Sequence, residues 1–413
     1  MTGGFDTGAA AERYAACNAA ALGWMLGRGL RGPGFVDTKV NPMTGADYTR
    51  ADGLRGPDYT YGWIQGRALE ALATHARFFE ARDPGLARAL DAAGRRLYRA
   101  LADLLAEDGH IYFCYDRDMR PVLADQAGIV AQSRPADIWT FSDAFAAKGL
   151  VAGAARHAPA ELPERLAYLD RVVEAVRAGR FQMNERAPLG EAALAAQPAD
   201  FGPRMIVLGA CGMLRRLGLG DHAGFGPAFL EHVLSHHLDT GTGLLLNVPG
   251  EPACNVGHGI ELVGFALDDP ALAADPARVE TLADILRACF RAGFKGPGIV
   301  LSVSAETGEV RDPHCPWWPL PETIRAAALA HALTGRADMA EIWQAADAAF
   351  FERYWQAGRG YAYQTLVPGG PVDFVPATPD LDPGYHTGLS LLAAIGATTH
   401  TATEKDEVAH GGR

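Results

Sequence analysis

The sequence predicts an all-α fold, specifically an (α/α)6 barrel with short β-hairpins on its rim loops. Three features of the 413 residues support this prediction: Ala-rich apolar segments recur with helical spacing, short links join them in pairs, and a brief β-like run follows several pairs. Such self-similarity is typical of repeat folds, and six helix pairs can close on themselves. An open helical array that binds other proteins is the alternative.

Twelve segments have the apolar periodicity of helices. They are 9–27, 62–81, 86–106, 138–157, 161–178, 204–217, 226–238, 258–267, 276–293, 321–334, 337–356 and 385–396. Asp83-Pro84 ends one helix and begins the next, the link 335–338 joins another pair, and Gly179 and Gly218 are typical of helix ends. These short links predict antiparallel helix pairs.

Four runs after predicted helices have strand character, which we interpret as small hairpins on one rim of the barrel. They are 109–113, 243–246, 298–301 and 360–363. Aromatic loops such as 112–115 and 317–318 favour a ligand pocket over a protein-binding surface. Because we find no linker, we expect a single catalytic domain over residues 1–399 and a flexible tail over residues 400–413.

Composition narrows the classes of partner. A net charge of -12, without a cluster of Lys and Arg, disfavours nucleic acid and anionic membranes. We recognise neither a signal peptide nor a transmembrane segment, so we expect a cytoplasmic protein. Six widely spaced cysteines without a CxxC pair indicate reduced, buried thiols, although Cys254 and Cys315 lie near motifs and could line a site.

Two familiar patterns are rejected. Residues 27–32 match GxGxxG but follow a helix-like segment and run into Pro33, so they do not predict dinucleotide binding. His232, His236 and His237 share a helix as in some metal sites, yet no Glu follows His232, and we interpret them as a solvated or hairpin-packed helix end. These two patterns therefore predict neither dinucleotide binding nor a metal site.

A histidine and a glutamate in residues 257–261, Gly-His-Gly-Ile-Glu, have the spacing of a catalytic pair. His258 and Glu261 lie three residues apart at the start of a predicted helix, so they can face one cavity together. A carboxylate partner fixes the tautomer of an imidazole, as a base that removes a proton next to a carbonyl requires. The same pair also occurs as a purely structural contact in helical cores.

Three further segments complete a recognisable set. They are Trp63 to Arg67 (WIQGR), Trp317 to Glu322 (WWPLPE) and Tyr385-His386. Together with 257–261, in this order and spacing, they resemble the N-acylglucosamine 2-epimerase superfamily, whose members show W-x-Q-G-R, G-H-x-x-E, W-W-P-x-x-E and Y-H. The resemblance extends from about residue 34 to residue 394.

The resemblance implies an (α/α)6 barrel that opens a free aldose and moves the proton at C2 through a cis-enediolate, without a cofactor. His258 and His386 match the two acid/base histidines, Arg67 the cation that stabilises the enediolate oxygen, and Glu261 the carboxylate that steers its histidine. Return of the proton to C2 inverts that carbon, whereas return to C1 gives aldose–ketose isomerisation.

The resemblance also implies a set of substrate-binding residues. Trp317 and Trp318 match a stacking wall for the sugar, with core packing as the alternative, and Glu322 matches a ligand of sugar hydroxyls, with a favourable charge at a helix start as the alternative. Tyr385 belongs to the last motif. Arg204 could hold an anionic or acyl substituent or be a surface charge.

The chain departs from the family pattern at three places. Residues 201–205 replace the N-x-H-M-H segment of cellobiose-epimerising relatives, which disfavours disaccharides. Leu262 replaces the usual aromatic residue, and 383–384 replace a frequent Lys. We expect a monosaccharide substrate, N-acylglucosamine or N-acylmannosamine first. A mannose/fructose-type isomerase, a glycoside hydrolase and a non-catalytic sugar-binding barrel are the alternatives, and the sequence leaves a homodimer open.

Overall fold

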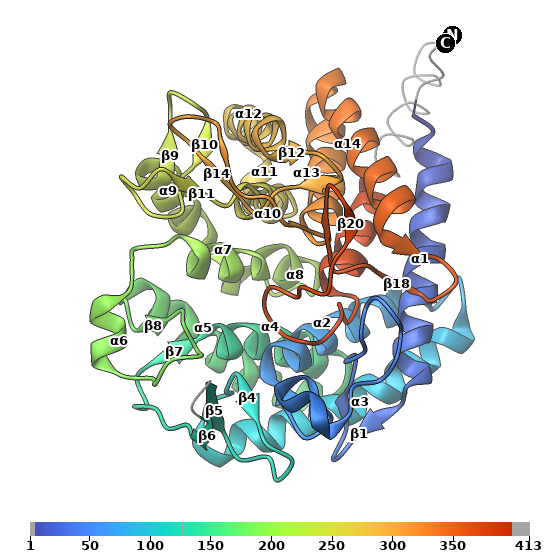
Figure 1. The fold of residues 1–413 in the computed structure, drawn as a ribbon, viewed down its shortest axis with the longest axis vertical. Helices are drawn as coiled ribbons and strands as arrows, with labels where there is room; N and C mark the ends of the chain where they lie inside the picture. Colours follow the sequence, from blue (N-terminus) through green and yellow to red (C-terminus); the bar gives the residue numbers. More distant parts are fainter. Residues whose placement is uncertain (1–4, 126–127, 399–413) are drawn as a thin grey trace. The chain divides into compact units, whose positions relative to one another are not determined.

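The computed structural model describes residues 5–125 and 128–398, which form helices connected by short strands (Figure 1). The chain divides into two compact units. The first unit consists of Met1–Ala20, Gly226–Phe374 and His386–Arg413. The second unit consists of Ala21–Phe225 and Val375–Tyr385. Helix α1 (Thr7–Gly27) begins in the first unit and ends in the second.

The second unit is built around α2, which packs against both α3 and α4, while α4 also packs against α5. Its helices are α2 (Gly62–Phe79), α3 (Pro84–Asp108), α4 (Phe141–His157), α5 (Leu162–Arg177), α6 (Glu191–Ala196), α7 (Gly202–Leu208) and α8 (Ala210–Arg216). Glycines permit the close approach of α2 and α4: a Cβ at Gly66 would lie 2.4 Å from the carbonyl carbon of Phe145, and one at Gly149 would lie 2.3 Å from the carbonyl oxygen of Gly66.

The predicted break between α2 and α3 is confirmed, and its cause is a helix cap. The side chain of Asp83 accepts a hydrogen bond from the backbone N–H of Leu86 (3.0 Å), and Pro84 occupies the first helical position, where a missing N–H costs nothing. The link after α13 is confirmed as well, since Gly335 ends that helix with a φ of 68°.

The first unit places α10 against α12 and α13, and α13 against α14. Its helices are α9 (Gly226–His237), α10 (Val256–Leu267), α11 (Pro270–Ala273), α12 (Pro276–Gly293), α13 (Pro319–Thr334) and α14 (Ala337–Ala349), with the π-helices η4 (Phe350–Tyr354) and η5 (Tyr385–Leu389). Tyr14 of α1 joins this packing, because its hydroxyl donates to Asp347 and accepts from the indole N–H of Trp343, both at 2.8 Å.

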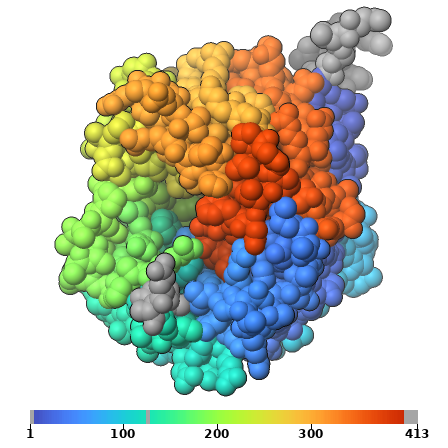
Figure 2. All heavy atoms as spheres, viewed as in Figure 1, coloured from blue at the N-terminus to red at the C-terminus, as the bar shows by residue number. Residues whose placement is uncertain are grey.

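The strands are short, and most pair locally. Hairpins directly follow three helices: β9 (Leu238–Asp239) with β10 (Leu244–Leu245), β12 (Phe294–Lys295) with β13 (Gly298–Ile299), and β17 (Trp355–Gln356) with β18 (Tyr361–Ala362). Two three-stranded sheets join β11 (Ala253–Cys254), β14 (Ser302–Ser304) and β15 (Val310–Asp312), and β16 (Cys315–Pro316), β19 (Thr365–Val367) and β20 (Gly370–Pro371). The β14–β15 hairpin, in orange in Figure 2, lies at the surface, where Val310 is 40% exposed.

The second unit holds the remaining pairs. They are β1 (Leu30–Arg31) with β2 (Phe35–Val36), β3 (Thr60–Tyr61) with β4 (Cys114–Tyr115), β5 (Val122–Asp125) with β6 (Gly128–Ala131), and the parallel pair β7 (Trp139–Thr140) with β8 (Phe181–Gln182).

The prediction of a mainly helical fold with short hairpins is confirmed, with three differences in detail. The predicted helix 204–217 is interrupted at Gly209, where α7 ends and α8 begins. The predicted helix 337–356 leaves the α-conformation after Ala349. The run 109–113 is not a strand: the strand comes one residue later as β4, and its partner is the distant β3.

The patterns rejected from the sequence have structural roles. Residues 27–32 span the end of α1 and strand β1, and His237 is buried at the end of α9, where its Nδ1 contacts the carbonyl oxygen of Leu246 (3.0 Å). All six cysteines are free and buried. The predicted tail 400–413 lies outside the described residues, and the single domain over 1–399 stays a prediction. None of the described helices has the length and apolar character needed to cross a bilayer.

Candidate active site

The amino-terminal turn of α10 holds His258 in one orientation. Asn255 caps the helix, and its side-chain oxygen accepts a hydrogen bond from the backbone N–H of His258 (3.4 Å). The backbone N–H of Asn255 donates to Oδ1 of Asn247 (2.6 Å), so the amide nitrogen of Asn247 is the group that faces Nδ1 of His258, at 3.4 Å. Because an amide NH2 only donates, Nδ1 of His258 accepts, and a neutral His258 carries its proton on Nε2.

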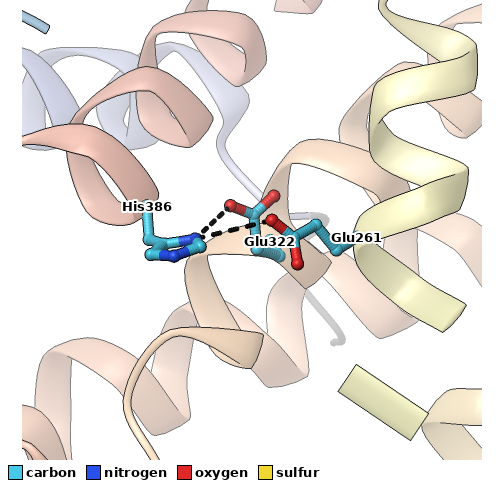
Figure 3. Close-up of side chains that lie close together, drawn as sticks. All are labelled: Glu261, Glu322 and His386. Atoms are coloured by element: carbon cyan, nitrogen blue, oxygen red, sulfur yellow. Dashed lines mark hydrogen bonds and ion pairs between the residues drawn. The ribbon is translucent and has the colours of Figure 1, made fainter. Parts of the chain in front are cut away.

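His386 has the opposite arrangement. Its Nδ1 lies 3.0 Å from Oε1 of Glu322 and 3.8 Å from Oε1 of Glu261, as the dashed lines in Figure 3 show. An ionised carboxylate only accepts, so Nδ1 of His386 donates and carries the proton. In the neutral ring, Nε2 of His386 is then the basic nitrogen.

A buried guanidinium balances this acidic cluster. Nη1 of Arg325 lies 3.2 Å from Oε2 of Glu322, and Nη2 donates to the hydroxyl of Ser390 (2.8 Å). Burial would raise the pKa of Glu322, but the charge of Arg325 and the hydrogen bond from His386 outweigh burial and lower it. Glu322 is therefore an ionised acceptor at neutral pH, although its side chain is fully buried.

Trp318 brings the two histidines together. Its ring centroid lies 5.6 Å from that of His258 and 5.6 Å from that of His386, and the neighbouring Trp317 meets His386 edge to face at 6.2 Å. Gly257 makes room for this packing, since a Cβ at that position would lie 2.6 Å from Cη2 of Trp318. The packing of Trp318 therefore explains why the first position of the G-H-x-x-E motif is a glycine in this chain.

The carboxylate of Glu261 lies close to the imidazole of His386, at 3.8 Å, and the orientation of His258 by Glu261 stays a prediction. Helical spacing placed Glu261 and His258 on one side of α10, but α10 packs against α13, and this packing turns Glu261 towards the cluster of Glu322 and His386. The amide of Asn247, which the motif does not contain, is the group that contacts the ring of His258.

The W-x-Q-G-R segment lies in the second unit, where three aromatic rings surround Arg67, one of them from the segment itself. The Arg67 guanidinium lies 4.0 Å from the ring centroid of Phe145, 5.2 Å from that of Trp63 and 5.4 Å from that of Tyr385. The hydroxyl of Tyr385 accepts from the buried ammonium of Lys148 (2.5 Å). Arg67 and Tyr385, both predicted to act on the substrate, are therefore neighbours.

Arg204, predicted as a contact for an anionic or acyl substituent, lies half-buried on α7 of the second unit. Burial alone lowers the pKa of its guanidinium.

The structure thus gathers six of the predicted residues in the first unit and three in the second. The first group is His258, Glu261, Trp317, Trp318, Glu322 and His386, and the second is Arg67, Arg204 and Tyr385. Sequence reasoning missed Asn247, Arg325, Ser390 and Lys148. Glu322 and Arg325 lie three residues apart in an Ala-rich predicted helix, and this spacing indicates an ion pair.

Glu261, Glu322 and His386 could also hold a metal ion, because one ligand atom from each lies within 4.8 Å of the others. Arg325 already supplies a positive charge to Glu322, so this carboxylate is paired within the protein itself.

Similar solved structures extend over nearly the whole chain. The cellobiose 2-epimerase from Bacillus thermoamylovorans B4167 is 14% identical, with 91% of this chain and 95% of that chain covered and a TM-score of 0.68. A D-mannose isomerase is 12% identical, with 93% and 97% covered and a TM-score of 0.67. An unsaturated glucuronyl hydrolase specific for heparin is 11% identical, with 94% and 98% covered and a TM-score of 0.56.

The sequence itself matches no protein-family model and no curated protein. Because an epimerase, an isomerase and a hydrolase all share this architecture, the fold alone does not determine the reaction. For the fold, the prediction is confirmed: the chain has the mainly helical (α/α)6 fold that the cellobiose 2-epimerase and the D-mannose isomerase also have.

Proposed function

We propose that this chain is a carbohydrate 2-epimerase that acts on a free aldose through a cis-enediolate. The observation that carries the proposal is the opposite tautomer of two imidazoles that contact the same indole. His386, with its proton on Nδ1, presents a basic Nε2. His258, with its proton on Nε2, presents an acid. Inversion of a carbon needs one group of each kind.

In the proposed reaction, Nε2 of His386 removes the proton from C2 of the open-chain aldose. Two carboxylates and one guanidinium leave one negative charge in the cluster when all are ionised, so the imidazolium that forms is balanced by Glu322 and Glu261. His258 gives its Nε2 proton to C2 from the other face. Water then takes the extra proton from His386 and supplies a proton to His258, so both imidazoles return to their neutral forms. The opposite epimer reacts in the reverse direction, from the state in which Nε2 of His386 carries the proton and Nε2 of His258 does not.

Arg67 is the residue that we assign to the enediolate oxygen, on the strength of the W-x-Q-G-R motif and of the aromatic rings that hold its guanidinium. For Glu322 the full burial and the partners His386 and Arg325 favour a positioning role over the sugar contact that the motif implied. We assign the stacking wall to Trp318.

The test is an NMR assay of free aldoses in D2O, beginning with N-acylglucosamine and N-acylmannosamine. Epimerisation through an enediolate incorporates deuterium at C2 and produces the C2 epimer. If no aldose acquires deuterium at C2, the proposal fails. We expect the activity to persist after chelation of divalent ions, because the two imidazoles and a guanidinium supply the proton transfer and the charge stabilisation.

An aldose–ketose isomerase is the second candidate, and the D-mannose isomerase among the similar structures favours it. The same two histidines serve both reactions, and a ketose in the product mixture distinguishes them. A glycoside hydrolase, the class of the third similar structure, would need two carboxyl groups that reach the glycosidic bond. Glu261 and Glu322 are 2% and 0% exposed and surround His386, which favours positioning over that role.

A further inference from the structure

A separate cavity lies within the second unit, next to the W-x-Q-G-R segment. Its volume is about 440 Å³, within the range of small-molecule pockets. The wall combines apolar and polar side chains from loops far apart in the sequence, among them Tyr61, Phe113, Glu185, Arg186, Val375 and Thr378. The cavity is therefore large enough for a sugar ring or a substituent of similar size.

Trp63 connects this cavity to Arg67. On one side, the Arg67 guanidinium lies 5.2 Å from the Trp63 ring. On the other, the indole N–H of Trp63 donates to Glu185 (2.5 Å), and its ring meets that of Phe113 edge to face at 5.3 Å. Since Glu185 and Phe113 both line the cavity, Trp63 contacts the predicted enediolate-binding arginine as well as the cavity wall.

Arg186 gives the cavity a cation suited to an anionic ligand. Its guanidinium lies 5.6 Å from the Phe113 ring and donates through Nη2 to the carbonyl oxygen of Ala377, another lining residue. In the described part of the chain no carboxylate forms an ion pair with Arg186. A second guanidinium, that of Arg55, also lines the cavity. Arginine's planar fork matches a carboxylate with two parallel hydrogen bonds.

The acidic residue in the wall does not compete for Arg186. The carboxylate of Glu185 accepts from the indole of Trp63 and from the backbone N–H and hydroxyl of Ser142, at 3.0 and 2.5 Å. These donors hold Glu185 in the wall, and Arg186 keeps the capacity to bind a ligand.

We propose that this cavity binds a carboxylate-bearing part of the sugar substrate, with Arg186 as its anchor, so that the preferred substrates are acidic aldoses such as hexuronates. The proposal rests on the proposed function only in placing the reacting end of the sugar beside Arg67. In this proposal Arg186 binds the anionic substituent, which the sequence had assigned to Arg204.

The test compares two glycosides that cannot open their ring, so that binding is measured without turnover. Calorimetry or ligand-observed NMR with the full chain would measure methyl glucopyranosiduronate and methyl glucopyranoside. The uronate is expected to bind at least about tenfold more tightly, since a charge-assisted pair contributes this much. Arg186→Gln should remove the preference, and Val375→Trp, which fills the cavity, should weaken both ligands.

The matched control is Arg177→Gln, which removes the same charge from an exposed ion pair on α5. It should leave the preference for the uronate unchanged. Equal binding of the two glycosides by the native chain, or a preference that survives Arg186→Gln, would overturn the proposal.

Turnover separates this proposal from the function on which it rests. If the chain prefers the uronate through Arg186 but no aldose acquires deuterium at C2, the proposed carboxylate site is supported and the epimerase proposal fails. Deuterium incorporation with no preference for glucuronate over glucose, in the native chain and in Arg186→Gln alike, means the reverse.

Discussion

Nδ1 of His386 donates to Oε1 of Glu322 across 3.0 Å, and this hydrogen bond joins residues 64 positions apart in the chain. The carboxylate fixes the tautomer of the imidazole, and in the proposed reaction it stabilises the imidazolium that forms when Nε2 takes a proton. Glu322 is in turn held by Arg325, so the basic nitrogen depends on a buried chain of three charged or polar groups.

Glu322→Gln is expected to weaken the proposed base. The amide oxygen can still accept from Nδ1, but the negative charge that favours the imidazolium is lost. Steady-state kinetics should show a kcat lower by about 10²-fold, the scale of general-base catalysis, with little change in KM. A kcat equal to that of the native chain would show that Glu322 does not act on the base.

Asn247→Asp is expected to reverse the tautomer of His258. The carboxylate keeps an acceptor for the backbone N–H of Asn255 but now requires a proton on Nδ1, so neutral His258 loses the proton on Nε2 that it is proposed to deliver. Epimerisation should slow by about 10²-fold. Asn247→Ala, which removes the contact without imposing a tautomer, is the control and should retain more activity than Asn247→Asp. Equal activity of the two variants would contradict the assignment.

His386→Asn is expected to abolish turnover without unfolding the protein. The asparagine amide can still donate to the carboxylate of Glu322, which avoids leaving that buried charge without a donor. The base is removed, so the rate of deuterium incorporation at C2 should fall by about 10³-fold or more. Thermal unfolding should shift by only a few degrees. A variant that loses its cooperative unfolding transition would identify His386 as a structural residue of the core.

Local sequence signals were sufficient for most of the fold. Ala-rich periodicity located the helices, and Asp83-Pro84 marked a real cap because its side chain and ring suit the first helical turn. The parallel pairing of β7 with β8 joins residues about 40 apart and left no local pattern. The break at Gly209 was missed because the residues on both sides are equally apolar.

In the site, too, local motifs predicted some features, whereas contacts between distant elements could not be predicted. Motifs identified the histidines and Trp318, but the partner of each imidazole depends on packing between elements. Helical spacing alone paired Glu261 with His258, whereas the contact between α10 and α13 directs Glu261 to His386. Asn247 lies in a loop before α10 and has no motif, so its contact with His258 could only come from the structure.

The stability of the fold should depend on pH, because one buried carboxyl group has a raised pKa. Burial raises the pKa of Glu185 from 4.5 to about 7, although the hydrogen bonds from Ser142 and Trp63 and the charge of Arg134 lower it in part. Between these two values the folded state holds a proton that the unfolded state has released. The free energy of unfolding therefore falls as the pH rises from about 4.5 through about 7, by up to about 3 kcal/mol.

Glu185→Gln should remove this dependence, because an amide stays neutral and can accept from Trp63 while donating to the hydroxyl of Ser142. The variant should be more stable than the native chain at pH 8 and nearly equal to it at pH 5, as measured by urea unfolding. Asp380, whose pKa burial raises to about 6, titrates in the same window in both proteins and cancels in the difference. If the native chain is as stable relative to Glu185→Gln at pH 8 as it is at pH 5, Glu185 ionises in the folded protein without a loss of stability.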